Sequence, residues 1–329
     1  MARKRVLITG AAGYLSRQLL PVFRERYDLV LLDRRKPHDI DDIIEVDLVN
    51  PDIDTYREHF KGVDAIVHNT RSTRPGVNTG APRQWLKDRP LGDLEGYYVE
   101  RDSLDMAYHV FRLAQEEGVT RVVTASSNHA TDWYETKLHD GRMDSCDHTT
   151  YPLSDNFYGW AKIAYENLGF IFATGRFGRP VENIHIRIVV PRAVDGAKLA
   201  SNQTTYKRDL AGYISERDLQ QLYMKSIETP DIRNADGVPW HCFYGVSDNT
   251  RSCWSIANAR QVIGYAPQDD SERVFADDIA RFVTSNGAPR LERHVSRLSF
   301  LLERSQASSL PPAWRWAKLR VSRCWVKAP

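Results

Sequence analysis

Residues 5–16 read RVLITGAAGYLS, a short apolar run that passes through two glycines into a helical pattern. The apolar run predicts a buried strand over 5–9, and the spacing of the following apolar residues predicts a helix over 14–26. Gly10 and Gly13 allow a tight turn between them, in which backbone amides at a helix N-terminus approach a pyrophosphate. The candidate dinucleotide contacts in this segment are Gly10, Ala12, Gly13, Tyr14 and Leu15.

Outward from this turn, short apolar runs alternate with helix-like segments. Such alternation is typical of a parallel sheet whose strands are joined by crossover helices. The strands are expected at 5–9, 29–33, 43–46, 64–68, 121–125, 184–190 and 240–244. The helices are expected at 14–26, 99–117, 216–226 and 255–263. The predicted fold class is therefore α/β, a Rossmann-type doubly wound parallel sheet with a smaller C-terminal substrate-binding region.

Three regions are expected along the 329 residues of the chain. Residues 1–190 form the dinucleotide-binding domain, and residues 191–287 form a substrate-binding region with elements that return to that domain. Residues 288–329 form a basic extension, because the tail from Arg290 onward carries nine Lys or Arg and two Glu. The tail thus carries a formal charge of about +7, so the net charge of +2 for the whole chain leaves about −5 on the rest of it. This mildly acidic body argues against nucleic-acid binding by the main domain.

The composition, with 42% hydrophobic and 27% charged residues, is ordinary for a soluble globular protein. No stretch approaches the ~18 apolar residues of a membrane span, and the N-terminal residues show no secretory signal pattern. The four cysteines lie far apart without metal-ligand spacing, which suits reduced thiols. We therefore expect a cytoplasmic protein without a membrane span or a metal site.

An acidic residue stands where a dinucleotide's adenosine ribose is expected. Asp33 ends the second strand, twenty residues after Gly13. A carboxylate there accepts the ribose hydroxyls and repels a 2′-phosphate, which favours NAD over NADP. Arg34, Arg35 and Lys36 favour the opposite choice, since basic side chains hold a 2′-phosphate. NAD is the expected cofactor, with NADP less favoured.

A tyrosine and a lysine lie one helical turn apart, downstream of a strand that ends in two serines. Tyr158 is a poor base at the ordinary tyrosine pKa of about 10. Lys162 follows it on the same helix face, so its charge can stabilise the phenolate. Ser127 can then hold a substrate oxygen while Tyr158 moves the proton.

Together these motifs resemble the extended short-chain dehydrogenase/reductase family, over roughly residues 4–280. The segments 126–129, 245–249 and 264–270 resemble a sugar-oxidising branch that contains uronate dehydrogenases and archaeal NAD-dependent glucose-6-phosphate dehydrogenases. The resemblance implies that the catalytic residues are Ser127, Tyr158 and Lys162. The further cofactor contacts it implies are Asp47, Leu48, Asn69, Tyr158 and Lys162. The substrate contacts it implies are Ser72, Ser127, Asn128, His129, Arg187 and Ser215.

Two segments depart from the family's pattern. Ser103, Met106 and Ala107 stand where the family usually carries Asn-x-x-Gly-Thr, whose asparagine supports the proton relay. The fourth strand ends in His-Asn-Thr-Arg-Ser at 68–72 instead of a His-Leu-Ala-Gly-like turn. Both changes lie near the expected nicotinamide site, so they bear on activity more than on the fold. For Arg187, a structural ion pair remains the alternative to substrate binding.

The resemblance implies an NAD-dependent oxidoreductase that oxidises the anomeric hydroxyl of an anionic sugar, a uronate or sugar phosphate, to a lactone. A nucleotide-sugar epimerase or dehydratase is one alternative. A catalytically silent NAD(H)-binding protein is the other. The expected partner is a small-molecule sugar, and the resemblance also implies a homodimer formed through a helix pair that includes the Tyr158 helix.

Overall fold

The computed structural model describes residues 3–79, 93–199 and 202–284. Met1–Asp277 form one compact unit, and of the second unit only residues 278–284 are described. The predicted basic extension at 288–329 lies outside the described residues. None of the described helices is long and apolar enough to cross a membrane.

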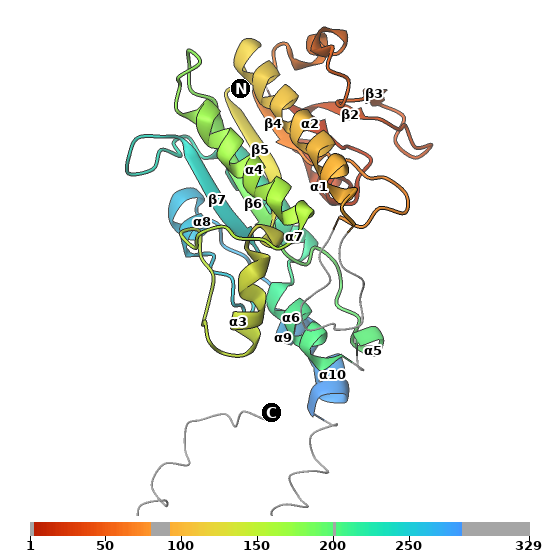
Figure 1. The fold of residues 1–329 in the computed structure, drawn as a ribbon, viewed down its shortest axis with the longest axis vertical. Helices are drawn as coiled ribbons and strands as arrows, with labels where there is room; N and C mark the ends of the chain where they lie inside the picture. The colour runs from red at the N-terminus through yellow and green to blue at the C-terminus, as the bar shows by residue number, and fades with distance from the viewer. Residues whose placement is uncertain (1–2, 80–92, 200–201, 285–329) are drawn as a thin grey trace, which may run out of the picture. The chain divides into compact units, whose positions relative to one another are not determined.

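Seven strands form a single parallel sheet in the order β3-β2-β1-β4-β5-β6-β7 (Figure 1). The strands are β1 (Arg5–Thr9), β2 (Asp28–Asp33), β3 (Ile43–Glu45), β4 (Ala65–His68), β5 (Arg121–Ser127), β6 (Glu182–Ile188) and β7 (Trp240–Gly245). All seven expected strands are present, and the Rossmann-type doubly wound fold is confirmed. The last strand returns to the sheet beside β6, although about fifty residues separate the two in sequence.

The helices and turns lie between the strands and beyond β7. The α-helices are α1 (Tyr14–Arg26), α2 (Gly96–Glu116), α3 (Glu135–His139), α4 (Phe157–Ala173), α5 (Gly196–Leu199), α6 (Gln203–Gly212), α7 (Glu216–Glu228), α8 (Ala257–Ile263), α9 (Ser271–Val274) and α10 (Ala276–Ile279). The 3-10 helices are η1 (Ile53–Thr55), η2 (Arg57–Phe60) and η3 (Asn128–Tyr134), and η4 (Ala280–Thr284) is a π-helix. The sequence pattern did not predict α6, which buries Arg208 and Asp209 together with its apolar residues.

Both faces of the sheet are covered. Helices α2 and α4 pack side by side (Figure 1), and with Leu7 and Ile66 of the sheet they form one hydrophobic core. Neighbouring side chains of a strand point to opposite faces, so Val6 and Ile8 lie on the other side, where they are also fully buried. Continuous apolar strands are expected for a sheet covered on both sides.

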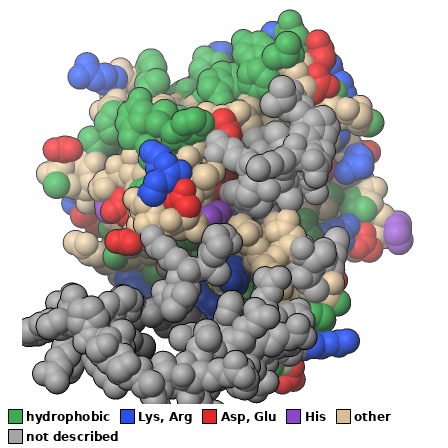
Figure 2. Space-filling model, turned by 60° about the horizontal axis from the view of Figure 1, so that its bottom comes forward, with side chains coloured by type: hydrophobic (Ala, Val, Ile, Leu, Met, Phe, Trp, Pro, Cys, Tyr) green, Lys and Arg blue, Asp and Glu red, His purple; other side chains and the backbone are tan. Residues whose placement is uncertain are grey.

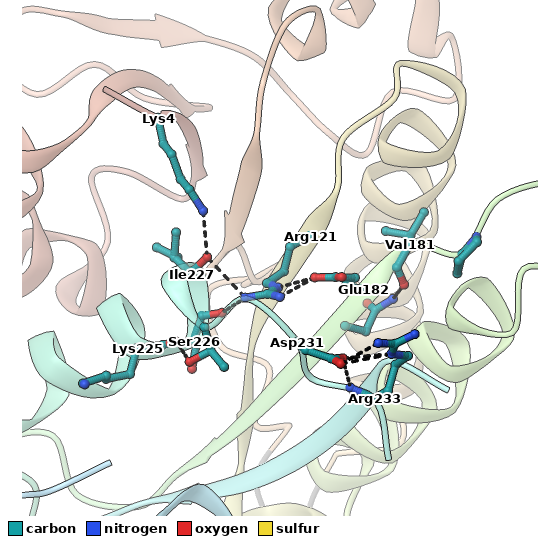
Figure 3. A network of polar contacts seen from close by, with 12 residues as sticks. Lys4, Arg121, Val181, Glu182, Lys225, Ser226, Ile227, Asp231 and Arg233 are labelled. Carbon is teal, nitrogen blue, oxygen red and sulfur yellow. Dashed lines mark hydrogen bonds and ion pairs between the residues drawn. The ribbon is translucent and has the colours of Figure 1, made fainter. Parts of the chain in front are cut away.

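A polar network closes the edge of the sheet where the strands begin (Figure 3). Arg121, at the start of β5, donates to the carbonyls of Ser226 and Ile227 at 2.9 and 3.2 Å and to Glu182 at 2.7 Å. Lys4 also donates to the carbonyl of Ile227, at 3.4 Å. These bonds satisfy carbonyls at the C-terminal end of α7, which have no partner within the helix. This edge is therefore structural, and the opposite edge is left for ligands.

Candidate active site

A crevice opens at the carboxyl ends of β1 and β4, which are neighbours in the sheet. The chain leaves β1 for β2 on one side and leaves β4 for β5 on the other, so the crossovers diverge there. Ligands of doubly wound sheets bind at such a switch point. The crevice is lined, among others, by Gly10, Ala12, Gly13, Asp33, Asp47, Leu48, Asn69, Arg71 and Ser72. We call it the cofactor cleft.

The glycine turn packs too closely against the protein backbone to accept side chains at Gly10 and Gly13. Gly10 has φ +69°, and a Cβ on it would lie 3.0 Å from the backbone of Asn69 and Thr70. A Cβ on Gly13 would lie 3.0 Å from the Gly10 carbonyl, whose oxygen accepts from the Gly13 amide. The turn meets the first residues of α1, so it has the form of a pyrophosphate cradle. These residues fit NAD.

Asp33 lines the cofactor cleft where the adenosine of NAD is expected. Its carboxylate accepts from the Ala12 amide at 3.0 Å and from the Arg35 amide at 3.1 Å. Arg34 lines the same cleft and donates to Thr73 at 3.3 Å. The carboxylate is thereby fixed beside the glycine turn, where ribose hydroxyls are expected.

The remaining predicted cofactor residues differ in how they are placed. Asp47 and Leu48 follow β3 and line the cleft. Asn69 also lines it, but its side-chain amide is already bonded to Ser16 at 3.1 Å and to Tyr223 at 3.0 Å. The lining does not include Tyr14, whose side chain is largely exposed, or Leu15, so these two are placed at the start of α1 beside the cleft.

The three predicted catalytic residues come together where β5 ends and α4 begins. Asn156 caps α4 by accepting from the Gly159 amide at 2.9 Å, which places Tyr158 in the first turn. A Cβ on Gly159 would lie only 2.1 Å from the His129 carbonyl, so glycine lets α4 approach the end of β5. The Lys162 ammonium donates to the Ala125 carbonyl at 2.7 Å and lies 5.5 Å from the centre of the Tyr158 ring.

Burial shifts the pKa values of both titratable groups away from what proton transfer needs. It raises the pKa of Tyr158, while the neighbouring Arg71 and the hydrogen bond from Ser127 act to lower it. Burial also lowers the pKa of Lys162 to about 7, with Arg71 adding to the decrease and Glu100 opposing it. The cation that lowers the pKa of the Tyr158 phenol is therefore a residue that the sequence motifs did not single out as functional.

That residue is Arg71, which lies just beyond β4 in the segment that departs from the family pattern. Its guanidinium carbon lies 4.4 Å from the centre of the Tyr158 ring. Glu100 of α2 is fully buried and accepts from the Nε and Nη2 atoms of Arg71 at 3.3 and 3.0 Å. The helical spacing of Glu100 could have pointed to it in the sequence, because it places this charged residue on the same face of α2 as the buried Ser103 and Ala107.

Ser103 stands where the family usually has the relay asparagine. Its hydroxyl accepts from the Ser72 amide at 2.9 Å and donates to the Val99 carbonyl at 3.3 Å. Ser103 therefore ties the segment after β4 to α2. Ser72 itself is buried and lines the cofactor cleft.

Of the predicted sugar contacts, His129 faces a hollow beside the catalytic tyrosine. Its ring centre lies 5.1 Å from that of Tyr158, and its Nδ1 lies 2.5 Å from the Asp132 carboxylate. Burial alone would raise the pKa of Asp132, but His129 and Asn156 hold it below its ordinary value. Asn128 is buried and donates from Nδ2 to Glu135 at 2.7 Å, whereas its Oδ1 has no hydrogen-bond partner among the described residues.

The structure places two predicted substrate residues in structural roles. The Arg187 guanidinium is 2% exposed and forms a two-point ion pair with Glu166 of α4, at 2.8 and 2.7 Å. Its Nη1 donates to the Tyr244 hydroxyl at 3.3 Å, and Arg187 lines neither the cofactor cleft nor the hollow beside Tyr158, which is compatible with the alternative of a structural ion pair. Ser215 caps α7 by accepting from the Asp218 amide at 3.3 Å. The pattern Ser-Glu-Arg-Asp at 215–218 is a readable capping signal.

Comparison with known proteins agrees with this geometry. The sequence profile of the NAD dependent epimerase/dehydratase family matches residues 6–174, which hold the glycine turn and the Tyr158–Lys162 pair. The chain belongs to this family. As an epimerase/dehydratase family member it uses NAD as its cofactor. The predicted resemblance to the extended short-chain dehydrogenase/reductase family is confirmed.

Two curated relatives cover most of the chain. The NAD-dependent glucose-6-phosphate dehydrogenase of Haloferax volcanii is 31% identical over 281 residues, 81% of this chain and 94% of that protein. The uronate dehydrogenase of Pseudomonas syringae pv. tomato is 28% identical, over 82% of this chain and 83% of that protein. Several family members similar to this chain are thus sugar dehydrogenases.

Solved structures show the same fold. A mutated uronate dehydrogenase superposes with a TM-score of 0.63 at 23% identity, covering 85% of this chain and 86% of that one. The uronate dehydrogenase of Agrobacterium tumefaciens, solved as a tyrosine mutant with NAD, superposes with a TM-score of 0.60 at 22% identity, covering 86% and 91%.

Proposed function

We propose that this chain oxidises the anomeric hydroxyl of an anionic sugar, a uronate or a sugar phosphate, to a lactone, with NAD as the hydride acceptor. The observation that carries the proposal is the grouping of Tyr158 with Lys162 and Ser127, next to Arg71, which lines the cofactor cleft. The names of the similar dehydrogenases, for glucose 6-phosphate and for uronates, supply the substrate class.

Tyr158 takes the proton of the anomeric hydroxyl. A phenol near its ordinary pKa of about 10 is a weak base, so a neighbouring positive charge is needed to stabilise the phenolate. As the proton leaves, the hydrogen on the anomeric carbon departs with its electron pair, and the carbon–oxygen bond becomes the lactone carbonyl. NAD, when bound, supplies the acceptor for that hydride.

Ser127 and Lys162 position the reacting groups. The Ser127 hydroxyl, at the end of β5, hydrogen-bonds the Tyr158 phenol, so an oxygen held between them faces both donors. Lys162 is 4% exposed, and its Nζ is bound to the Ala125 carbonyl 5.5 Å from the centre of the Tyr158 ring, where it would hold the nicotinamide ribose of bound NAD. Holding the reactants in this geometry removes much of the entropic barrier to the transfer.

A homodimer through α2 and α4 belongs to the same proposal. The groove between these helices has a volume of about 540 Å³ and is lined by Leu104, Tyr108, Trp160, Ile163 and Ile171, among others. Tyr108, Trp160 and Ile171 are exposed there, and hydrophobic side chains also gather on the surface seen in Figure 2. A self-complementary apolar helix pair suits a two-fold interface, and the mass of the protein in solution tests it.

The test is NADH formation by the full chain with glucose 6-phosphate, D-glucuronate, D-glucose and L-arabinose. L-arabinose is included because a 25% identical protein of Haloferax volcanii is named as an L-arabinose 1-dehydrogenase. We expect the NADH band to grow with an anionic sugar and to stay flat in the Tyr158→Phe variant. No growth with any sugar, while NAD still raises the melting temperature, would contradict the proposal and favour a silent NAD(H)-binding protein.

A further inference from the structure

We propose that Arg71 binds the anionic group of the sugar, a part that the family resemblance assigned to Arg187. This inference rests on the proposed function, since it names the group in the same site that selects a charged substrate. It is carried by a second cavity, by the way Arg71 is held in it, and by the pairing of the other cations nearby.

The second cavity lies on the side of Tyr158 where the sugar is expected. It has a volume of about 400 Å³ and is lined by Arg71, Thr73, Arg74, Thr79, His129 and Tyr158, among others. Arg71 also lines the cofactor cleft, so its side chain stands between the two cavities. We call this second cavity the sugar hollow. A sugar in it has its reacting end at Tyr158 and the rest of the molecule among basic side chains.

Arg71 is held so that one side of its guanidinium remains available. Glu100 and the Thr79 hydroxyl accept from its Nε and Nη2 atoms, and Glu100 itself is fully buried. Nη1 makes no hydrogen bond to any residue in the described ranges, and the Arg71 side chain is 37% exposed. A guanidinium fixed at one edge and open at the other is suited to a carboxylate or phosphate oxygen.

The guanidinium also lies close enough to the reacting end for a single sugar ring. Its carbon is 4.4 Å from the centre of the Tyr158 ring, and the His129 ring centre lies 5.1 Å from that of Tyr158. A monosaccharide is short, so the group that anchors its charged end must stand near the catalytic phenol. Arg71 meets this condition.

The other cations near Tyr158 are engaged elsewhere. Arg187 is buried in its two-point pair with Glu166, and the Lys162 ammonium is bound to the Ala125 carbonyl. Arg74, at the rim of the sugar hollow, is 53% exposed and lies 4.0 Å from Glu95. Arg74 adds positive charge at the entrance, but as an exposed side chain it is held less firmly than Arg71.

The test measures sugar binding in equilibrium, so that it does not depend on turnover. The full chain saturated with NADH is titrated by calorimetry with glucose 6-phosphate, D-glucuronate and D-glucose. We compare wild type with Arg71→Gln and Arg71→Lys, and with Arg101→Gln as the control. Arg101 is an exposed residue of α2 that pairs with Asp102 and Asp105 outside the sugar hollow.

We expect Arg71→Gln to weaken binding of an anionic sugar by about tenfold or more, the loss typical of one charge-assisted hydrogen bond. Binding of glucose should change by less than about twofold, Arg71→Lys should recover part of the loss, and Arg101→Gln should match wild type. Where the sugar is turned over, KM should rise for the anionic sugars alone, whereas any fall in kcat, from the lost charge beside Tyr158, should be the same for charged and neutral sugars.

Equal losses for charged and neutral sugars would overturn the inference, because Arg71 would then act only through Tyr158 or the cofactor and not on the anionic group. Unchanged binding in Arg71→Gln would overturn it as well, as would a wild-type protein that binds neither charged sugar. A wild type that binds the charged sugar through Arg71 but forms no NADH refutes the proposed function alone. Turnover that survives unchanged in Arg71→Gln refutes the role of Arg71 alone.

Discussion

Replacing Lys162 with methionine should make the protein more stable near neutral pH while abolishing its activity. Lys162 is 4% exposed, and burial lowers its pKa from the ordinary 10.5 to about 7. The unfolded chain therefore holds a proton on this side chain, between pH 7 and 10.5, that the folded chain releases. Folding is penalised below the unfolded pKa, most strongly at pH 7 and under, and stability rises with pH across this window.

The size of the penalty follows from the two pKa values. One pKa unit corresponds to ~1.4 kcal/mol, so the penalty is about 4–5 kcal/mol at pH 6.5 and about 1–2 kcal/mol at pH 9.5. Methionine removes the penalty but also removes the hydrogen bond from Lys162 to the Ala125 carbonyl, worth about 1 kcal/mol at every pH. Lys162→Met should therefore exceed wild type by about 3–4 kcal/mol at pH 6.5 and by under about 1 kcal/mol at pH 9.5.

The assay is urea unfolding of the two proteins without NAD, followed by circular dichroism at several pH values. Only the difference between the proteins is used. Lys162 affects the pKa values of the buried His68 and His185, but these lie at about 3 and about 4, below the pH range of the assay. Lys225→Met, on the exposed side of α7, is the control for the loss of a surface lysine. A Lys162→Met difference that is constant from pH 6.5 to 9.5 would refute the reasoning, because the lysine would then be charged in the folded protein.

Three further substitutions probe the site and its support. Tyr158→Phe should lower the rate of NADH formation by about 10²–10⁴-fold and leave NAD affinity, measured by calorimetry, unchanged. Asp33→Ser removes the carboxylate at the ribose end, so KM should rise for NAD and fall for NADP, each by about tenfold. Arg187→Met leaves Glu166 buried without its cation and should destabilise the protein by about 3–5 kcal/mol in urea unfolding, whereas adding Glu166→Leu should restore most of that loss.

Each of these has an outcome that counts against it. Turnover retained by Tyr158→Phe would move the proton transfer to another group. An unchanged preference for NAD in Asp33→Ser would show that the carboxylate serves only the Ala12 and Arg35 amides. A folded and stable Arg187→Met that has lost affinity for charged sugars alone would return the anchoring role to Arg187.

Local chemistry made several parts of the site readable in the sequence. Gly10 and Gly13 follow a strand and open a helix, so the cradle depends only on neighbours in the chain. The position of Asp33 beside the glycine turn could also be predicted, because Asp33 ends β2, which runs parallel to β1, and parallel strands end at the same edge of a sheet. The pairing of Tyr158 with Lys162 follows from helical periodicity.

Partners that are distant in sequence were not readable in this way. The sequence contains both Arg187 and Glu166, but only the packing of α4 against β6 brings them into a buried pair. Arg71 and Glu100 likewise meet because α2 lies beside the end of β4. Arg71 and Glu100 belong to no sequence motif. A buried carboxylate needs a cation nearby, and residues at many positions in the sequence could supply that cation.

The sequence by itself determined the fold class, the cofactor turn and the Tyr158–Lys162 pair, because periodicity and turn chemistry act over a few residues. Only the tertiary structure decided which cations remain available to a ligand. The buried Arg187 pairs with Glu166 through Nε and Nη2 and also donates from Nη1 to the Tyr244 hydroxyl, so it serves stability. The partly exposed Arg71 is paired through Nε and Nη2 alone among the described residues, so it can still bind a ligand. That difference depends on burial and on partners from other elements, which no local pattern records.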